Sequence, residues 1–336
     1  MGQSLKATGR PQISTLHNGK RVRAVGNQIY SRPPSETFHE FLLVVSGNTF
    51  GGEWYKTEFN KPFEERHVVA QWWIRYCDWT KKHVGAGNAV GGAWNAITDG
   101  PSQALIQLAY DIYLLLHCAS LPKTVVKRLR DREAFQGVRY EIAVAALFAR
   151  LGYRIEWEDE KQSARHCEFL ATNPRTGDVI GVEAKSRRRS GVLHEPVKYE
   201  GPVKLRGDIG GLLEKALTQK PEGKPFIIFV DLNLPTTAEP EFTKKPWYPD
   251  VDALIRSMSP PTTENPDLAN AIVITNFSSH YGEPGGQAPP GEYAVIVSRI
   301  PKDPAKNSDA LTEIGGVLQA YGPVPDDERP GGSSQQ

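Results

Sequence analysis

Residues 167–185, CEFLATNPRTGDVIGVEAK, hold two strand-like segments joined by a tight turn, and this stretch constrains the fold more than any other. The turn reads Asn-Pro-Arg-Thr-Gly-Asp, with Asn and Pro early and Gly late, which is typical of a hairpin connection. A hairpin centred between Arg175 and Thr176 places Glu168 directly opposite Glu183. Because opposed like charges destabilise a pair of strands, the two acids predict a site that holds a cation.

Lys185 belongs to the same group of charged residues. Side chains alternate between the two faces of a strand, so Lys185 shares a face with Glu183 and, across the hairpin, with Glu168. Isolated charges on an apolar strand are costly, so their convergence indicates a functional site. Carboxylate oxygens are hard ligands, which suit Mg²⁺ or Mn²⁺.

The first third of the chain has a helical pattern. Apolar residues recur at three- and four-residue spacing in residues 35–45, 63–83 and 101–120, which predicts an all-helical domain over residues 33–130. The preceding residues 1–32 are polar and basic, and we expect a flexible basic arm there. At the other end, residues 301–336 finish in DDERPGGSSQQ, which predicts a partly disordered tail.

Residues 131–300 have a different pattern, which predicts an α/β domain with a mixed sheet. A helix over residues 136–151 is followed by segments rich in β-branched and aromatic residues, and a second helix is expected over residues 208–220, with Asp208 as its cap. The expected strands are residues 153–157, 164–172, 178–186, 225–233, 271–277 and 292–298. The order is therefore helix, three strands, helix, strand, with further strands later.

Glu141 is the lone charge on an apolar stripe of the first of these helices. Its neighbours three and four residues away are Gly137, Val138, Val144 and Ala145. A carboxylate aimed from a helix towards a sheet either reaches solvent at the helix end or joins a polar site. The acids on the following strands favour the second interpretation.

These residues together resemble the PD-(D/E)XK, or restriction-endonuclease-like, nuclease superfamily. The resemblance rests on Gly137 and Glu141 on a helix, Gly-Tyr at its end, Glu168 on the second strand and the Glu183-x-Lys185 motif on the third. It covers about residues 133–233, under a third of the chain, and departs from the family pattern at Glu168, where Asp is usual.

The resemblance implies a fold, an activity and a set of residue roles. The fold is a restriction-endonuclease-like core of helix, three antiparallel strands, helix and strand, and the activity is metal-dependent cleavage of phosphodiester bonds. It further implies that Glu141, Glu168 and Glu183 bind Mg²⁺ or Mn²⁺, and that Lys185 orients or activates the attacking water. All four residues would then be catalytic.

Basic residues after the motif are candidates for nucleic-acid binding. Arg187, Arg188 and Arg189 follow Lys185 directly, and Lys198, Lys204 and Arg206 precede the second helix. The alternative interpretation is a solvated charge run. Lys215 and Gln219 lie four residues apart on the expected helix, and some members of the superfamily place a Lys or Gln near the site at this point.

Composition limits the partners and the setting. With a net charge of +1, any nucleic acid must be bound by a local basic patch. The three cysteines are widely spaced and lack a CxxC pair, which favours a reducing, cytoplasmic setting over a disulfide framework. No apolar run reaches the roughly 18 residues that a membrane span needs, so we expect no membrane contact.

The sequence leaves several functions open. The leading hypothesis is a Mg²⁺-dependent deoxyribonuclease, with roles in restriction, phage defence or DNA repair all compatible with the fold. One core holds one site, so cutting both strands would need two chains, and a homodimer is one hypothesis. The alternatives are a catalytically inactive member of the same fold that binds DNA or protein, an RNA nuclease, and a different α/β fold in which Glu141 lies far from Glu183.

Overall fold

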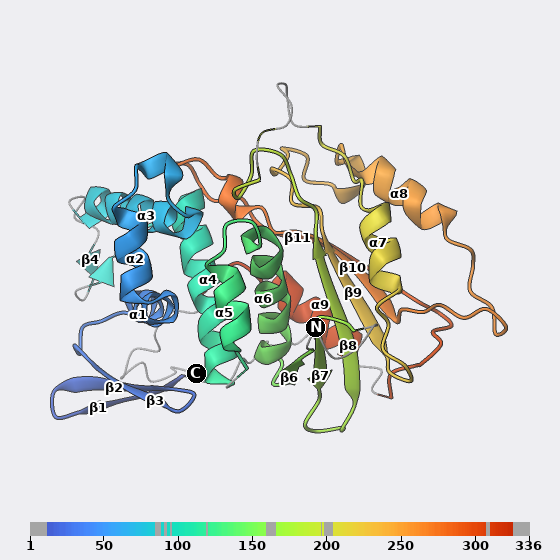
Figure 1. Cartoon of the computed structure of the whole chain (residues 1–336), viewed down its shortest axis with the longest axis horizontal. Helices are drawn as coiled ribbons and strands as arrows, with labels where there is room; N and C mark the ends of the chain where they lie inside the picture. The colour runs from blue at the N-terminus through green and yellow to red at the C-terminus, as the bar shows by residue number, and fades with distance from the viewer. Residues whose placement is uncertain are drawn as a thin grey trace.

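The computed structural model describes residues 12–84, 89–90, 93–94, 96–118, 120–158, 166–195, 197, 204–306 and 310–324. These residues form a mixed α/β protein with a three-stranded antiparallel sheet, a six-stranded mixed sheet and a short two-stranded hairpin. Figure 1 shows helices on both sides of the six-stranded sheet, with α5 and α6 on one side and α7 and α8 on the other.

The six-stranded sheet has the order β11-β10-β9-β8-β7-β6. Its strands are β6 (Arg154–Trp157), β7 (Phe169–Thr172), β8 (Val179–Ser186), β9 (Phe226–Asp231), β10 (Ala271–Asn276) and β11 (Glu292–Val297). Neighbours among β6, β7 and β8 are antiparallel, β8, β9 and β10 run parallel, and β11 is antiparallel to β10. The parallel centre and antiparallel edges make the sheet mixed, as the sequence predicts.

Two of the helices beside these strands were expected in this order, and a third, between β9 and β10, was not predicted. Helix α6 (Phe135–Arg150) precedes β6, α7 (Gly210–Leu217) lies between β8 and β9, and α8 (Tyr248–Ser257) lies between β9 and β10. Because parallel neighbours cannot be joined by a tight turn, α7 and α8 belong to the crossover connections. Helix α7 is shorter than the expected helix over residues 208–220. Its N-cap is Ile209, without a side-chain cap, so the predicted role of Asp208 as the cap is wrong.

A hydrophobic core lies on each face of the sheet. Alternate residues of β8, such as Val182 and Ala184, belong to the larger core with α6. Ile228 and Val230 of β9 belong to the second core, which α7 and α8 cover. This two-sided burial explains why the central strands are apolar along most of their length.

The helical region shares the larger core with the sheet. Its helices are α1 (Phe38–Phe50), α2 (Gly52–Phe59), α3 (Val68–Val84), α4 (Gly100–His117) and α5 (Lys123–Leu129), and the hairpin of β4 (Ala89–Val90) and β5 (Ala93–Trp94) lies between α3 and α4. Buried residues of α1, α4, α6 and the sheet form one continuous cluster. The expected domain boundary at residue 130 therefore does not divide the hydrophobic core in two. None of the helices in the described ranges is long and apolar enough to span a bilayer.

Part of the expected flexible arm is an ordered sheet. Strands β1 (Ile13–His17), β2 (Lys20–Val25) and β3 (Gln28–Arg32) pair as an antiparallel meander, whose first turn uses Asn18 and Gly19 at positive φ. Arg23 is 2% exposed, and its guanidinium lies 4.8 Å from the ring centre of Phe41. The prediction of flexibility is therefore wrong for residues 13–32, because these residues form paired strands and Arg23 is buried. Residues 1–11 lie outside the described part of the chain.

The C-terminal region also contains more structure than expected. Helix α9 (Ala310–Gln319) buries Ala310, Ile314, Val317 and Leu318 in the larger core. Apolar residues three and four apart explain this packing. The tail that was expected to be partly disordered therefore contains a helix, and residues 307–309 and 325–336 lie outside the described ranges.

Candidate active site

The hairpin of β7 and β8 confirms the predicted register. Phe169 pairs with Val182 and Thr172 pairs with Val179, so the next position places Glu168 opposite Glu183. The turn is closed by the hydrogen bond from Asn173 N to the carbonyl oxygen of Asp178, at 2.8 Å. The turn chemistry of the sequence therefore positions the two acids.

Lys185 joins the two acids. Its Nζ donates to Oε1 of Glu168 at 3.0 Å and forms an ion pair with Oε1 of Glu183. Burial lowers the pKa of Lys185, but the negative charges of Glu168 and Glu183 together raise it above its ordinary value. The ammonium therefore stays charged at neutral pH.

Glu183 is a buried acid that pairs with Lys185 through one carboxylate oxygen, Oε1. The residue is 1% exposed, and its other oxygen, Oε2, has no hydrogen-bond partner among the described residues. Burial, followed by repulsion from Glu168, raises the pKa of Glu183 to about 8, although Lys185 opposes this increase. A carboxylate in this state binds a proton or a cation readily.

Glu141 lies in the same electrostatic environment but has its own cationic partner. The residue is 4% exposed, and Arg128 of α5 donates from its two terminal nitrogens to the two carboxylate oxygens, at 2.8 and 2.7 Å. Burial and the charge of Glu168 raise the pKa of Glu141 to about 7, while Arg128 and Lys185 lower it. The charge of Glu141 in turn raises the pKa of Glu183.

The donor set fits a hard divalent cation in chemistry but not in its present arrangement. The three carboxylates supply oxygen ligands, and Oε2 of Glu183 has no hydrogen-bond partner among the described residues. Among the described residues, however, no group of three or more acids, histidines or cysteines is arranged to hold a metal ion. Lys185 and Arg128 occupy carboxylate oxygens that a cation would need, so binding requires these ion pairs to open.

The three arginines after Lys185 differ in what they contact. Arg189 is 9% exposed and donates to Asp208 Oδ1 and to the carbonyl oxygens of Arg206 and Leu232. Arg187 donates to Asp208 Oδ2 at 2.8 Å. Burial raises the pKa of Asp208, but its pairing with Arg187 and Arg189 outweighs burial and lowers this pKa below its ordinary value. The donors of Arg189 tie the chain after β8 to the chain after β9, and its contact with nucleic acid stays a prediction.

Arg188 is the most exposed of the three, at 57% of its side chain. It donates to the carbonyl oxygen of Glu133 at 3.0 Å, next to the start of α6, and lies 3.9 Å from Glu195. This contact joins the segment after β8 to the connection between α5 and α6. Arg188 therefore remains a candidate for phosphate contact.

The other predicted basic residues are dispersed over the connection to α7 and over α7 itself. Lys204 is exposed, and Arg206 has 62% of its side chain exposed and pairs with Asp250 at 3.4 Å. Lys215 is exposed on α7, but Gln219 lies beyond the end of this helix at Leu217, so the predicted helical pair is wrong. Lys198 lies outside the described residues.

Two polar groups of the structure were not predicted from the sequence. Arg128 contacts Glu141 from another helix, and a basic residue in a short helix carries no local signal of such a partner. Asp231, at the end of β9, is fully buried and accepts from Thr275 Oγ1 and Phe277 N, each at 3.0 Å, with Arg139 at 3.8 Å. An acid that ends an apolar strand could have been recognised as a buried polar centre.

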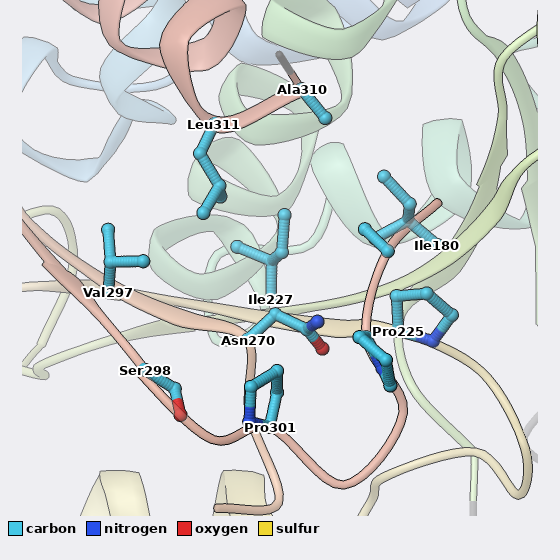
Figure 2. A pocket seen from close by; sticks show the side chains of 11 residues that line it. Ile180, Pro225, Ile227, Asn270, Val297, Ser298, Pro301, Ala310 and Leu311 are labelled. Atoms are coloured by element: carbon cyan, nitrogen blue, oxygen red, sulfur yellow. The ribbon is translucent and has the colours of Figure 1, made fainter. Parts of the chain in front are cut away.

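The described cavity lies away from these acids. It has a volume of about 150 Å³ and is lined by Ile180 and Ile227, at the amino ends of their strands, and by Asn270, Pro301 and Leu311. Figure 2 shows mainly apolar side chains around it, with Leu311 of α9 above. No acidic or basic side chain lines this cavity, so it is not part of the candidate site.

Comparison of the chain with protein-family models, with curated proteins and with solved structures gave no match. The assignment of a function therefore depends on the residues and geometry described above.

Proposed function

We propose that this protein is a metal-dependent nuclease that hydrolyses phosphodiester bonds in DNA, with a restriction-endonuclease-like core formed by α6, β6–β8, α7 and β9. The observation that carries the proposal is Glu183, a buried carboxylate beside Glu168 and Lys185 on one hairpin, whose Oε2 has no hydrogen-bond partner among the described residues. A purely structural pair with Lys185 would be expected to leave no oxygen of a buried acid unsatisfied, whereas a cation site must leave one available.

The residues have distinct roles in this proposal. Glu183 and Glu168 would hold Mg²⁺ or Mn²⁺, with Glu141 as a third ligand. When bound, the divalent cation supplies charge neutralisation for the phosphate and acidifies water near it. Lys185 has a raised pKa, so it would act as a charged donor to the phosphate or to water, and not as a base.

A second function is favoured by one observation. No group of three metal-ligating side chains among the described residues has metal-binding geometry, and Lys185 and Arg128 already pair with the acids. An inactive protein of the same fold that binds DNA or another protein would have these properties. In that case Lys185 and Arg128 would permanently replace the metal.

Cleavage of supercoiled plasmid and of single-stranded DNA tests the proposal. Wild type should cut in Mg²⁺ or Mn²⁺ and not in EDTA, and Lys185→Ala should lose at least about 100-fold in rate. Lys56→Ala is the matched control, because Lys56 is 72% exposed on α2. DNA binding without cutting by wild type would favour the inactive alternative, and nicking without double-strand cleavage would argue against a homodimer.

A further inference from the structure

Helix α5 has an apolar face and a cationic face. Val125 and Leu129 are 4% and 0% exposed and belong to the larger core. Lys123, Lys127 and Arg130 are exposed and lie four and three residues apart, so they form one stripe along the helix, the α5 stripe. At 3.6 residues per turn, the α5 stripe lies on the side of the helix opposite the two buried residues.

The cations of the α5 stripe are not balanced by acids. Helix α5 contains Lys123, Lys127 and Arg128 but no Asp or Glu. Among the described residues, neither Lys123 nor Lys127 forms an ion pair or a hydrogen bond through its side chain. Arg130 donates to the carbonyl oxygen of Thr49 at 2.8 Å, a neutral acceptor that does not cancel its charge. The charge of the α5 stripe is therefore available to a ligand.

Helix stability does not account for this arrangement. Like charges four residues apart, as in Lys123 and Lys127, destabilise a helix. The helix dipole favours Lys127 in the last turn but disfavours a cation at Lys123, the first residue of α5. A helix of seven residues has little stability of its own. An anionic partner explains why such a short helix contains these charges.

Further exposed cations connect the α5 stripe to the candidate site. Arg132 is exposed two residues beyond Arg130. Arg188, three residues after Lys185, donates to the carbonyl oxygen of Glu133, and its side chain is 57% exposed. Because Glu133 directly follows Arg132, a line of positive groups runs from α5 to the segment after β8. Figure 1 shows α5 beside α6, between the other helices and the six-stranded sheet.

These features fit a sugar-phosphate backbone. Residues 123–133 contain five basic and two acidic side chains, a net charge of +3, whereas the whole chain has a net charge of +1. The seven residues from Lys123 to Arg130 advance about 10 Å along a helix axis. Phosphates of one DNA strand advance about 3.4 Å each along the duplex, so the α5 stripe has the length of about three phosphates.

We propose that the α5 stripe binds the sugar-phosphate backbone of duplex DNA beside the candidate site. The proposal rests on the function proposed above for the identity of this partner. It requires no metal ion, because Lys123, Lys127 and Arg130 contact phosphate directly. Contacts to phosphate carry no sequence information, so this surface should bind DNA of any sequence.

Salt-dependent binding of the full chain tests the proposal. Labelled duplex DNA is titrated in EDTA at several KCl concentrations and followed by fluorescence anisotropy. Lys123→Ala/Lys127→Ala should lower the affinity at least about tenfold and reduce the slope of log affinity against log salt by about 1.8. Lys123→Arg/Lys127→Arg keeps both charges and should bind like wild type. The urea midpoint of the Ala variant should not fall, because Ala favours a helix more than Lys does.

Lys244→Ala/Arg256→Ala is the matched control. The two side chains are 66% and 78% exposed, and they lie on α8 and directly before it, on the other side of the six-stranded sheet. This variant loses the same two charges, but charges farther apart than about 10 Å are largely screened at 0.1 M salt. Its salt slope should equal that of wild type.

The outcomes separate this inference from the function on which it rests. An unchanged slope in Lys123→Ala/Lys127→Ala would overturn the inference, as would an equal loss in the control, or wild type that binds duplex RNA or no nucleic acid instead of duplex DNA. Cleavage of plasmid is measured separately. Binding through the α5 stripe without cutting keeps this inference and favours the inactive alternative. Cutting by wild type, with unchanged binding by the Ala variant, keeps only the nuclease function.

Discussion

Replacing Glu183 with Gln should stabilise the protein at alkaline pH. The buried acid has a pKa of about 8 in the folded protein, compared with an ordinary value of 4.5. Below about pH 4.5 the acid is protonated in both the folded and the unfolded state. Between about pH 4.5 and 8 the unfolded chain loses this proton while the folded chain retains it, so the free energy of unfolding of wild type falls as pH rises.

The size of the effect follows from this pKa difference. Each tenfold change in proton affinity corresponds to about 1.4 kcal/mol, which gives about 4 to 5 kcal/mol if Glu183 acts alone. The neighbouring carboxylates share their protons with Glu183, which relieves part of the cost. We therefore expect Glu183→Gln to raise the free energy of unfolding by about 2 kcal/mol at pH 9 and by much less at pH 5.

Urea unfolding in EDTA, followed by tryptophan fluorescence at pH 5, 7 and 9, measures this gain. Glu53→Gln is the control, because the Glu53 side chain is 93% exposed and should show no gain at any pH. The reasoning would be refuted if Glu183→Gln lost stability equally at all three pH values. That result would mean that the ion pair with Lys185 outweighs the cost of burying the charged carboxylate.

Three further predictions separate stability from ligand binding. Asp231→Ala should lower the free energy of unfolding in urea by about 3 kcal/mol, because it leaves the buried Arg139 without its counter-charge; an unchanged midpoint would contradict this role. Arg189→Ala should lower the free energy of unfolding by about 2 kcal/mol. Lys204→Ala, at an exposed position, should alter this free energy by less than about 0.5 kcal/mol and should weaken DNA binding in anisotropy titrations. Mn²⁺ affinity, measured by calorimetry, should rise from pH 6 to pH 9, because binding must displace the proton of Glu183; a flat pH profile would argue against Glu183 as a ligand.

Local chemistry explains why the sequence predicted the hairpin well. The turn from Asn173 to Asp178 contains the residues that a hairpin turn requires, and side-chain alternation then determines which residues face each other. The observed pairs of β7 and β8 have the predicted register. The positions of Glu168, Glu183 and Lys185 follow from that register.

Long-range contacts explain where the sequence was misleading. Basic residues suggested a flexible arm and a nucleic-acid surface, but Arg23 packs over an aromatic ring and Arg189 binds carbonyl oxygens of distant segments. The pairing of Arg128 with Glu141 likewise joins two helices. Sequence patterns report spacing within one element, so partners on other elements could not be predicted.

Cleavage of supercoiled plasmid by wild type and Glu183→Gln, with MgCl₂ titrated from zero, tests the central claim most directly. The account predicts cutting by wild type that rises and saturates with Mg²⁺, and a loss of at least about 100-fold in Glu183→Gln, which lacks the anionic ligand. Cutting that does not depend on Mg²⁺, or equal cutting by the two proteins, would contradict a metal-dependent site at Glu183.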